Sequence, residues 1–175
     1  LAPTDAPGLA VIAKMLRSLY LHREIREQGG AYGGFAVYNP EDGLFTLASY
    51  RDPQIAGTLK VFEGARDFLL PGSFGEEDVK EAVLQVCSEI DKPDPPGPAA
   101  RKAFYRRLLG LPDEERQRFK ARLLALDTGA VRRVAEAHFG AGAPAGAVAV
   151  IAGAEALEAA NRELGPAAAL SLQRI

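Results

Sequence analysis

The sequence predicts an α+β fold in which helices pack on one face of an antiparallel sheet. Two segments between residues 31 and 50 alternate apolar and polar side chains and are joined by turn-forming residues, as in an antiparallel hairpin. In most of the remaining chain, apolar residues recur at the helical period. Neighbouring strands followed by a series of helices are typical of α+β domains, whereas a doubly wound sheet alternates strands with helices.

The first predicted element is an amphipathic helix. Apolar residues recur at helical spacing from about Leu9 to Ile25, and Gly29 and Gly30 mark the end of this helix.

The hairpin follows directly. A strand over residues 31–38 should place Phe35 and Val37 on one face and its even-numbered residues on the other. "NPEDG" at 39–43 supplies the turn, and "LFTLASY" at 44–50 supplies the second strand.

Helices are expected from there to residue 138. Asp52 followed by Pro53 resembles an N-cap with proline at the first helical position. A further helix spans about 76–90, and the prolines of 91–98 interrupt the chain. Two or three helices should then occupy residues 99–138, with "PDEE" and "DTGA" as their starts.

The last two predicted elements are a short buried strand at 146–153, "GAVAVIAG", and a helix at 154–164. The prediction therefore contains three or four strands, which is few for so many helices. A missing N-terminal strand would explain the shortage.

Length and composition indicate one domain, residues 1–175. Hydrophobic residues make up 47% and charged residues 25% of the chain, as in ordinary folded proteins. The net charge of −2 gives no reason to expect nucleic acid or an anionic membrane as the main partner. The single cysteine, Cys87, excludes an internal disulfide and fits a reducing compartment such as the cytoplasm. Because the chain opens with "LAPTDAPG" and no methionine, we expect an excised or truncated piece of a larger functional unit.

The densest signal is "REQGGAYGG", Arg26 to Gly34, with four glycines around Tyr32. A phosphate-binding loop would precede a helix, whereas this stretch follows one. Two interpretations remain. The glycines end the helix before a weak strand, or they leave the strand bare so that another extended chain can pair with it. At a helix C-terminus, Arg26 can also act structurally by capping free carbonyl groups.

Metal binding and nucleophilic catalysis find little support in the residues. His22 and His138 lie on separate predicted helices, and "HREIRE" matches neither common zinc-helix spacing. A catalytic zinc ion needs three protein ligands. Cys87 lies beside an apolar helical stripe, which indicates packing.

A basic run, "RKAFYRRLLG…EERQRFKAR", contains acidic residues as well. Its apolar residues have core spacing, so we interpret it as the solvated face of amphipathic helices packed through Phe104, Leu108, Phe119 and Leu123.

Two motifs, "IREQGGAYGG" and "SYRDP", carry a family resemblance. The stretch "YLHREIREQGGAYGGFAVYNPEDGLFTLASYRDPQIAGTLKVFEGARDFL" resembles the C-terminal half of the presequence-protease branch of the pitrilysin/insulinase family of zinc metallopeptidases. The match continues through "LLGLPDEERQRFKARLLALDTGAVRRVAEA" and "VAVIAGAEALEAANRELG", and so covers nearly the whole chain.

The resemblance implies that zinc is bound by an N-terminal half outside this chain, and that this chain binds no metal itself. It implies catalytic roles for Arg26 and Tyr32, which would reach a peptide substrate. The backbone around them would receive that peptide, at Gly29, Gly30, Ala31, Gly33 and Gly34.

Some family members have lost catalysis, so a non-catalytic structural, peptide-binding or assembly module is the alternative. The location would be cytoplasmic, or the mitochondrial matrix in a eukaryote. We also expect the isolated piece to self-associate through exposed sheet edges.

Overall fold

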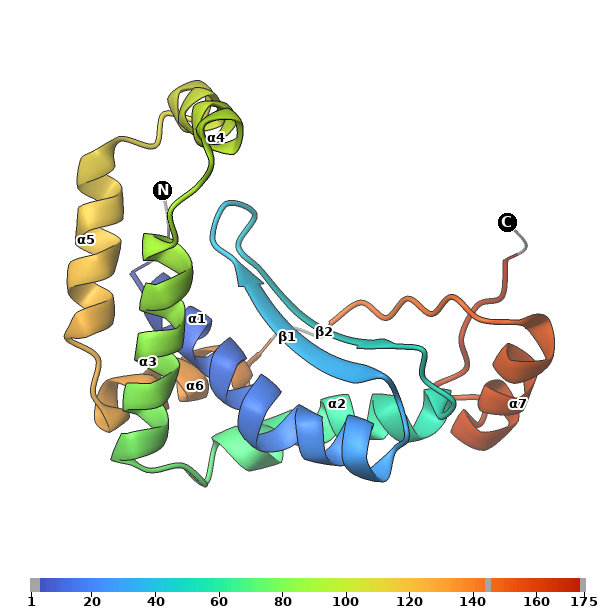
Figure 1. The fold of residues 1–175 in the computed structure, drawn as a ribbon. Coiled ribbons are helices and arrows are strands. Elements are labelled where there is room, and N and C mark those ends of the chain that lie inside the picture. Colours follow the sequence, from blue (N-terminus) through green and yellow to red (C-terminus); the bar gives the residue numbers. More distant parts are fainter. Residues whose placement is uncertain (1–3, 144–145, 174–175) are drawn as a thin grey trace.

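The computed structural model describes residues 4–143 and 146–173 (Figure 1). Its elements follow the order α1 (Ala6–Met15), η1 (Leu16–Gln28), β1 (Gly33–Asn39), β2 (Leu44–Tyr50), α2 (Ile55–Leu69), α3 (Glu76–Asp91), α4 (Pro96–Leu108), α5 (Asp113–Leu124), α6 (Thr128–Phe139) and α7 (Ala154–Leu164). The predicted α+β class is confirmed, with helices on one face of an antiparallel hairpin. No helix in these two ranges is long and apolar enough to cross a membrane.

A continuous helical rod, α1 followed by η1, forms the centre of the molecule. In η1 the backbone widens from the α to the π hydrogen-bond pattern. The prediction of one amphipathic helix is correct only for η1, where Leu16, Leu21 and Ile25 are the buried residues. Eight of the ten residues of α1 are buried, because α1 packs against β1, α3, α5 and α6 at once.

The sheet has two strands, with Gly33 opposite Tyr50 at one end and Asn39 opposite Leu44 at the turn. The alternation predicted for the first strand is confirmed. Its even-numbered residues Gly34, Ala36 and Tyr38 are buried, and β1 packs on the α1–η1 rod. Exposed apolar side chains lie on the opposite face of the hairpin at Val37, Leu44 and Tyr50.

The predicted buried strand at 146–153 is wrong. This segment is extended but pairs with no strand in the described chain, and Val148 and Ile151 are 58% and 89% exposed. The prediction failed because composition can favour a strand while burial depends on a partner strand elsewhere.

Helix starts were predicted with mixed success. The two hairpin strands and the helices α3, α5, α6 and α7 lie within two residues of their predicted positions. The predicted cap of α2 is wrong, because its N-cap is Gln54 and not Asp52, and Pro53 precedes the helix, which begins at Ile55. The proline-rich break is shorter than expected, since α4 already begins at Pro96. Proline is compatible with the first helical turn, where its missing N–H costs no hydrogen bond.

Helix α4 stands away from the rest of the molecule (Figure 1) and has no buried residue. The expectation that Phe104 and Leu108 pack in a core is therefore wrong, because these side chains are 65% and 68% exposed. In α5 the same expectation holds, since Leu123 is fully buried and Phe119 packs against the core. Cys87 also packs against the core, as predicted.

Candidate functional site

Arg26 lies in the last turn of η1 with its side chain exposed to solvent. The helix ends immediately behind it. The N–H of Gly30 donates to the carbonyl oxygen of Arg26 over 3.2 Å, and the N–H of Ala31 donates to the carbonyl oxygen of Ile25 over 3.1 Å. Gly30 has φ +77°, a left-handed conformation that glycine adopts without steric cost. Arg23 in the same helix pairs with Glu24, whereas within the described ranges no hydrogen bond or ion pair is found for the guanidinium of Arg26.

Tyr32 is the residue before β1, and its side chain is 66% exposed. Its position is fixed through the backbone, because its N–H donates to the carbonyl oxygen of Tyr50 over 3.1 Å and lies 3.4 Å from that of Arg51. The rings of Tyr32 and Tyr50 meet edge to face, with centroids 6.0 Å apart. Arg26, in the last turn of η1, and Tyr32, at the end of the loop that follows, are therefore both surface groups, and neither is buried in the core.

A second loop, Tyr50 to Gln54, supports the first. The Gln54 side-chain amide donates to the carbonyl oxygen of Gly29 over 3.2 Å. Pro53 faces Gly30, whose added Cβ would lie 3.9 Å from the Pro53 ring. Gln54 and Pro53 were not predicted to belong to the site. The hairpin register would have identified them, since counting back from the turn at 39–43 brings Tyr50 opposite Gly33.

The four glycines have different surroundings. A Cβ on Gly29 would lie 2.6 Å from the carbonyl oxygen of Ile25, and one on Gly34 would lie 3.1 Å from Leu21. Gly29 thus permits the helix end, and Gly34 permits close packing of β1 on η1. A Cβ on Gly33 would meet only the ring of Phe35, at 3.0 Å. Of the predicted substrate-binding positions, Ala31 and Gly34 are buried, whereas Gly30 is exposed.

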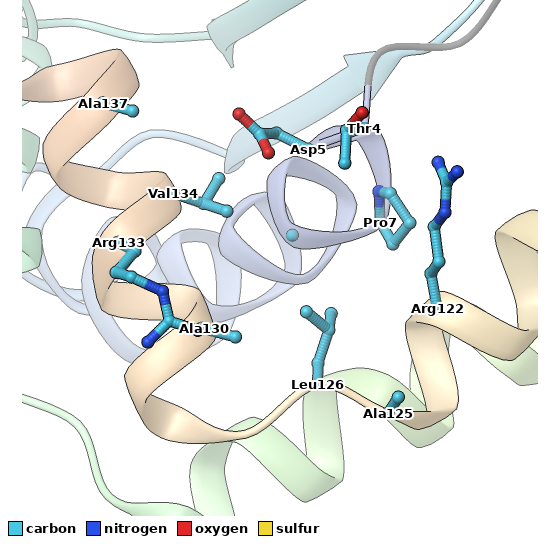
Figure 2. A pocket seen from close by; sticks show the side chains of 11 residues that line it. Thr4, Asp5, Pro7, Arg122, Ala125, Leu126, Ala130, Arg133, Val134 and Ala137 are labelled. Carbon is cyan, nitrogen blue, oxygen red and sulfur yellow. The ribbon is translucent and has the colours of Figure 1, made fainter.

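Two cavities in the described chain lie away from these residues. One, of about 500 Å³, is formed by the start of α1 with α5 and α6 (Figure 2). Leu126 lies between Arg122 and Arg133 in that view, so the two guanidinium groups do not converge. The other, of about 610 Å³, lies between α4 and α5. Neither is lined by Arg26 or Tyr32.

In residues 4–143 and 146–173, no group of three His, Cys, Asp or Glu side chains could hold a metal ion. The two histidines have carboxylate neighbours instead. His22 Nδ1 is 3.3 Å from Glu27, and His138 Nε2 is 3.0 Å from Asp5. The described residues therefore do not fit a zinc site, and no catalytic step in this chain is assigned to bound metal.

Comparison with known proteins identifies the family. Residues 4–143 match the model of the PreP C-terminal domain. The chain is 38% identical to the mitochondrial presequence protease of Kluyveromyces lactis over 135 residues, which is 77% of this chain and 13% of the relative. It is 38% identical to that of Mus musculus over 141 residues, 81% of this chain and 13% of the relative. It is 33% identical to presequence protease 1, chloroplastic/mitochondrial, of Arabidopsis thaliana over 153 residues, 87% of this chain and 14% of the relative.

The chain thus spans about one seventh of the length of these relatives. The family model covers four fifths of the chain, including the Arg26–Gly34 loop and the Tyr50–Gln54 loop. The domain model and the relatives confirm the resemblance found in the sequence. The chain belongs to the presequence protease family and corresponds to the C-terminal domain of these proteins.

Proposed function

We propose that this chain is the C-terminal substrate-binding part of a zinc-dependent metalloendopeptidase that degrades oligopeptides. Zinc would be bound by an N-terminal half outside this chain, and the peptide would bind between the two parts. Arg26 and Tyr32 would contact the peptide near the cleaved bond. A cytoplasmic location, or the mitochondrial matrix in a eukaryote, is proposed on the same basis, since the yeast and mouse relatives are named as mitochondrial.

The chemistry of these two side chains supports the proposal. Hydrolysis of a peptide bond places negative charge on the carbonyl oxygen of the transition state. A guanidinium and a phenol donate hydrogen bonds but need not themselves react, so both can stabilise that charge. Removing one such preorganised donor typically costs about 10²- to 10³-fold in kcat.

One observation carries the proposal: Arg26 and Tyr32 are exposed on either side of the short Gly29–Ala31 connection, whose backbone is held at both ends. The Tyr32 N–H bonds the Tyr50 carbonyl, and the Gly29 carbonyl accepts from Gln54. A purely structural arginine at a helix end would be expected to use its side chain on free carbonyls. Within the described chain no hydrogen bond or ion pair is found for the Arg26 side chain, unlike that of Arg23, which pairs with Glu24.

The test uses the intact parent polypeptide, or this chain combined with the zinc-binding half, and a fluorogenic peptide. Arg26→Ala and Tyr32→Phe should each lower kcat/KM by about 10²-fold or more. Arg107→Ala and Tyr105→Phe are matched controls, because both residues lie on the remote, exposed helix α4. Wild-type rates for both site variants would overturn the assignment. Peptide binding without cleavage by the intact protein would instead favour the non-catalytic binding or assembly module.

A further inference from the structure

Arg51 has an unusual backbone. Among the described non-glycine residues it alone has a positive φ, at +49°. Residues other than glycine rarely adopt this left-handed backbone conformation, and such outliers cluster where a functional group must be held in place. Arg51 directly follows β2, and its carbonyl oxygen lies 3.4 Å from the N–H of Tyr32.

The side chains continue the same arrangement. The Arg51 guanidinium lies over the Tyr50 ring, 5.4 Å from its centroid. The Tyr50 ring in turn meets the Tyr32 ring at an interplanar angle of 89°. Cation–π and edge-to-face contacts both restrict how an aromatic ring can turn. The Tyr50 ring is therefore contacted from two sides, by the ring of Tyr32 and by the guanidinium of Arg51.

We propose that Tyr50 and Arg51 are positioning residues that hold the phenol of Tyr32 in its reactive orientation. This inference rests on the proposed function of Tyr32. Tyr50 acts through its ring, which restricts the Tyr32 side chain to one rotamer. Arg51 acts on Tyr50, and its left-handed backbone turns the chain so that the guanidinium lies back over the strand end. Neither residue donates a proton to the substrate.

The alternative is a surface aromatic contact with no influence on chemistry. Phe104 and Tyr105 on α4 provide that comparison within the same chain, since their rings also meet edge to face, at 5.9 Å. Tyr105 is 58% exposed and Tyr50 is 54% exposed. The two tyrosines thus differ in their neighbours rather than in their exposure.

The experiment measures kcat and KM of the intact parent polypeptide on a peptide substrate. Tyr50→Phe keeps the ring and should remain within about threefold of wild type, whereas Tyr50→Leu should lower kcat by 10- to 100-fold and change KM little, because misplacing a reacting group by about 1 Å can cost 10²-fold. Arg51→Gly removes the cation and the backbone outlier together, so kcat should fall severalfold while the melting temperature stays level or rises. Tyr105→Leu is the matched control, with both constants unchanged.

A double-mutant cycle gives the decisive readout. If Tyr50 acts through Tyr32, then Tyr50→Leu should change kcat little in a Tyr32→Phe background, because coupled residues are not additive. Full additivity, equal losses for Tyr50→Phe and Tyr50→Leu, or wild-type kcat for Tyr50→Leu would each overturn the positioning role. Should Tyr50→Leu fold poorly, Arg51→Gly takes its place in the cycle, and full additivity of Arg51→Gly with Tyr32→Phe would overturn the positioning role. A wild-type rate for Tyr32→Phe alone would overturn the proposed function as well, which separates the two failures.

Discussion

The hydroxyl of Thr58 donates a hydrogen bond to a carboxylate oxygen of Asp52 across 2.6 Å. Thr58 is 6% exposed, and the other carboxylate oxygen of Asp52 accepts from the N–H of Gln54 at 2.8 Å. Asp52 thereby fixes the turn that carries the Tyr50–Gln54 loop into α2. We expect Thr58→Val to lower the free energy of unfolding by about 1.5–3 kcal/mol, because the lost hydrogen bond is to a charged group. Urea denaturation measures this.

Two controls define the result for Thr58. Thr58→Ser keeps the hydroxyl and should cost only about 0.8 kcal/mol for the missing methyl group. Thr46→Val changes an exposed threonine in β2 and should stay within about 0.5 kcal/mol of wild type. A Thr58→Val protein as stable as the Thr46→Val protein would contradict the role of Asp52.

Gly64 in α2 leaves space for the hydroxyl of Tyr20, which would lie 2.6 Å from an added Cβ. That hydroxyl donates to the carbonyl oxygen of Val61 over 3.0 Å, and its ring stacks on Phe68. Gly64→Ala should gain about 1 kcal/mol from helix propensity. The clash outweighs this gain, because it displaces the Tyr20 hydroxyl from its acceptor, so the free energy of unfolding of Gly64→Ala should fall by about 1 kcal/mol net.

In the Tyr20→Phe background, the effect of Gly64→Ala on stability should change sign. Tyr20→Phe removes the hydroxyl oxygen that an added Cβ on Gly64 would meet, so Gly64→Ala should stabilise that variant by up to about 1 kcal/mol. Thermal or urea denaturation of the four proteins measures the cycle. The same sign in both backgrounds would show that the Tyr20 hydroxyl does not constrain Gly64.

Tyr38 carries a buried hydroxyl with no hydrogen-bond partner in the described chain. Burial, and then the negative charge of Asp5, raise the pKa of Tyr38 above its ordinary value of 10.0. The folded protein therefore keeps this proton when the unfolded chain has lost it, and stability falls as the pH rises above 10. Tyr38→Phe should raise the free energy of unfolding by about 1 kcal/mol at neutral pH, because an unsatisfied buried group is removed.

The pH dependence checks the same variant. Between pH 9 and 11, Tyr38→Phe should lose less stability than wild type, since one group with a raised pKa no longer contributes. Tyr20, whose pKa is also raised, chiefly by burial, should still contribute the remaining loss. An unchanged alkaline slope in Tyr38→Phe would contradict the assignment.

The extended segment at 146–153 gives a prediction about association. Ile151 is 89% exposed, and both outer strand edges of the hairpin are unpaired in the described chain. Exposed edges and apolar segments pair readily, so the isolated chain should self-associate in sedimentation at rising concentration. Ile151→Asp should weaken this, whereas Leu84→Asp, at a 68% exposed position on α3, should not. A monomer at every concentration would contradict the prediction.

Local signals predicted much of the fold. The turn at 39–43 fixed the hairpin, and "DTGA" marked the start of α6, where the Asp127 side chain accepts from the N–H of Ala130. The same kind of signal misled at Asp52, because its carboxylate also accepts from a backbone N–H two residues later, as an N-cap would, but before the helix begins. Turn and cap differ there only in the backbone that follows.

Non-local packing set the limit on the remaining predictions. Residues 146–153 and the apolar side chains of α4 have the composition of buried elements, but burial requires partners that composition cannot name. For the candidate site, glycine density drew attention to the segment from Arg26 to Gly34, whose role stays a prediction. The contacts of that loop with Tyr50, Arg51 and Gln54 arise only when the hairpin closes, and the left-handed backbone of Arg51 has no signal in its residue type.

The rod formed by α1 and η1 has a consequence for synthesis. The residues of α1 are synthesised before those of α3, α5 and α6, against which α1 packs, and α6 ends only at Phe139. A growing chain must therefore carry an almost wholly apolar segment for more than a hundred residues before its last partner is made. Until α6 is made, α1 therefore offers an apolar segment that a nascent-chain chaperone could bind.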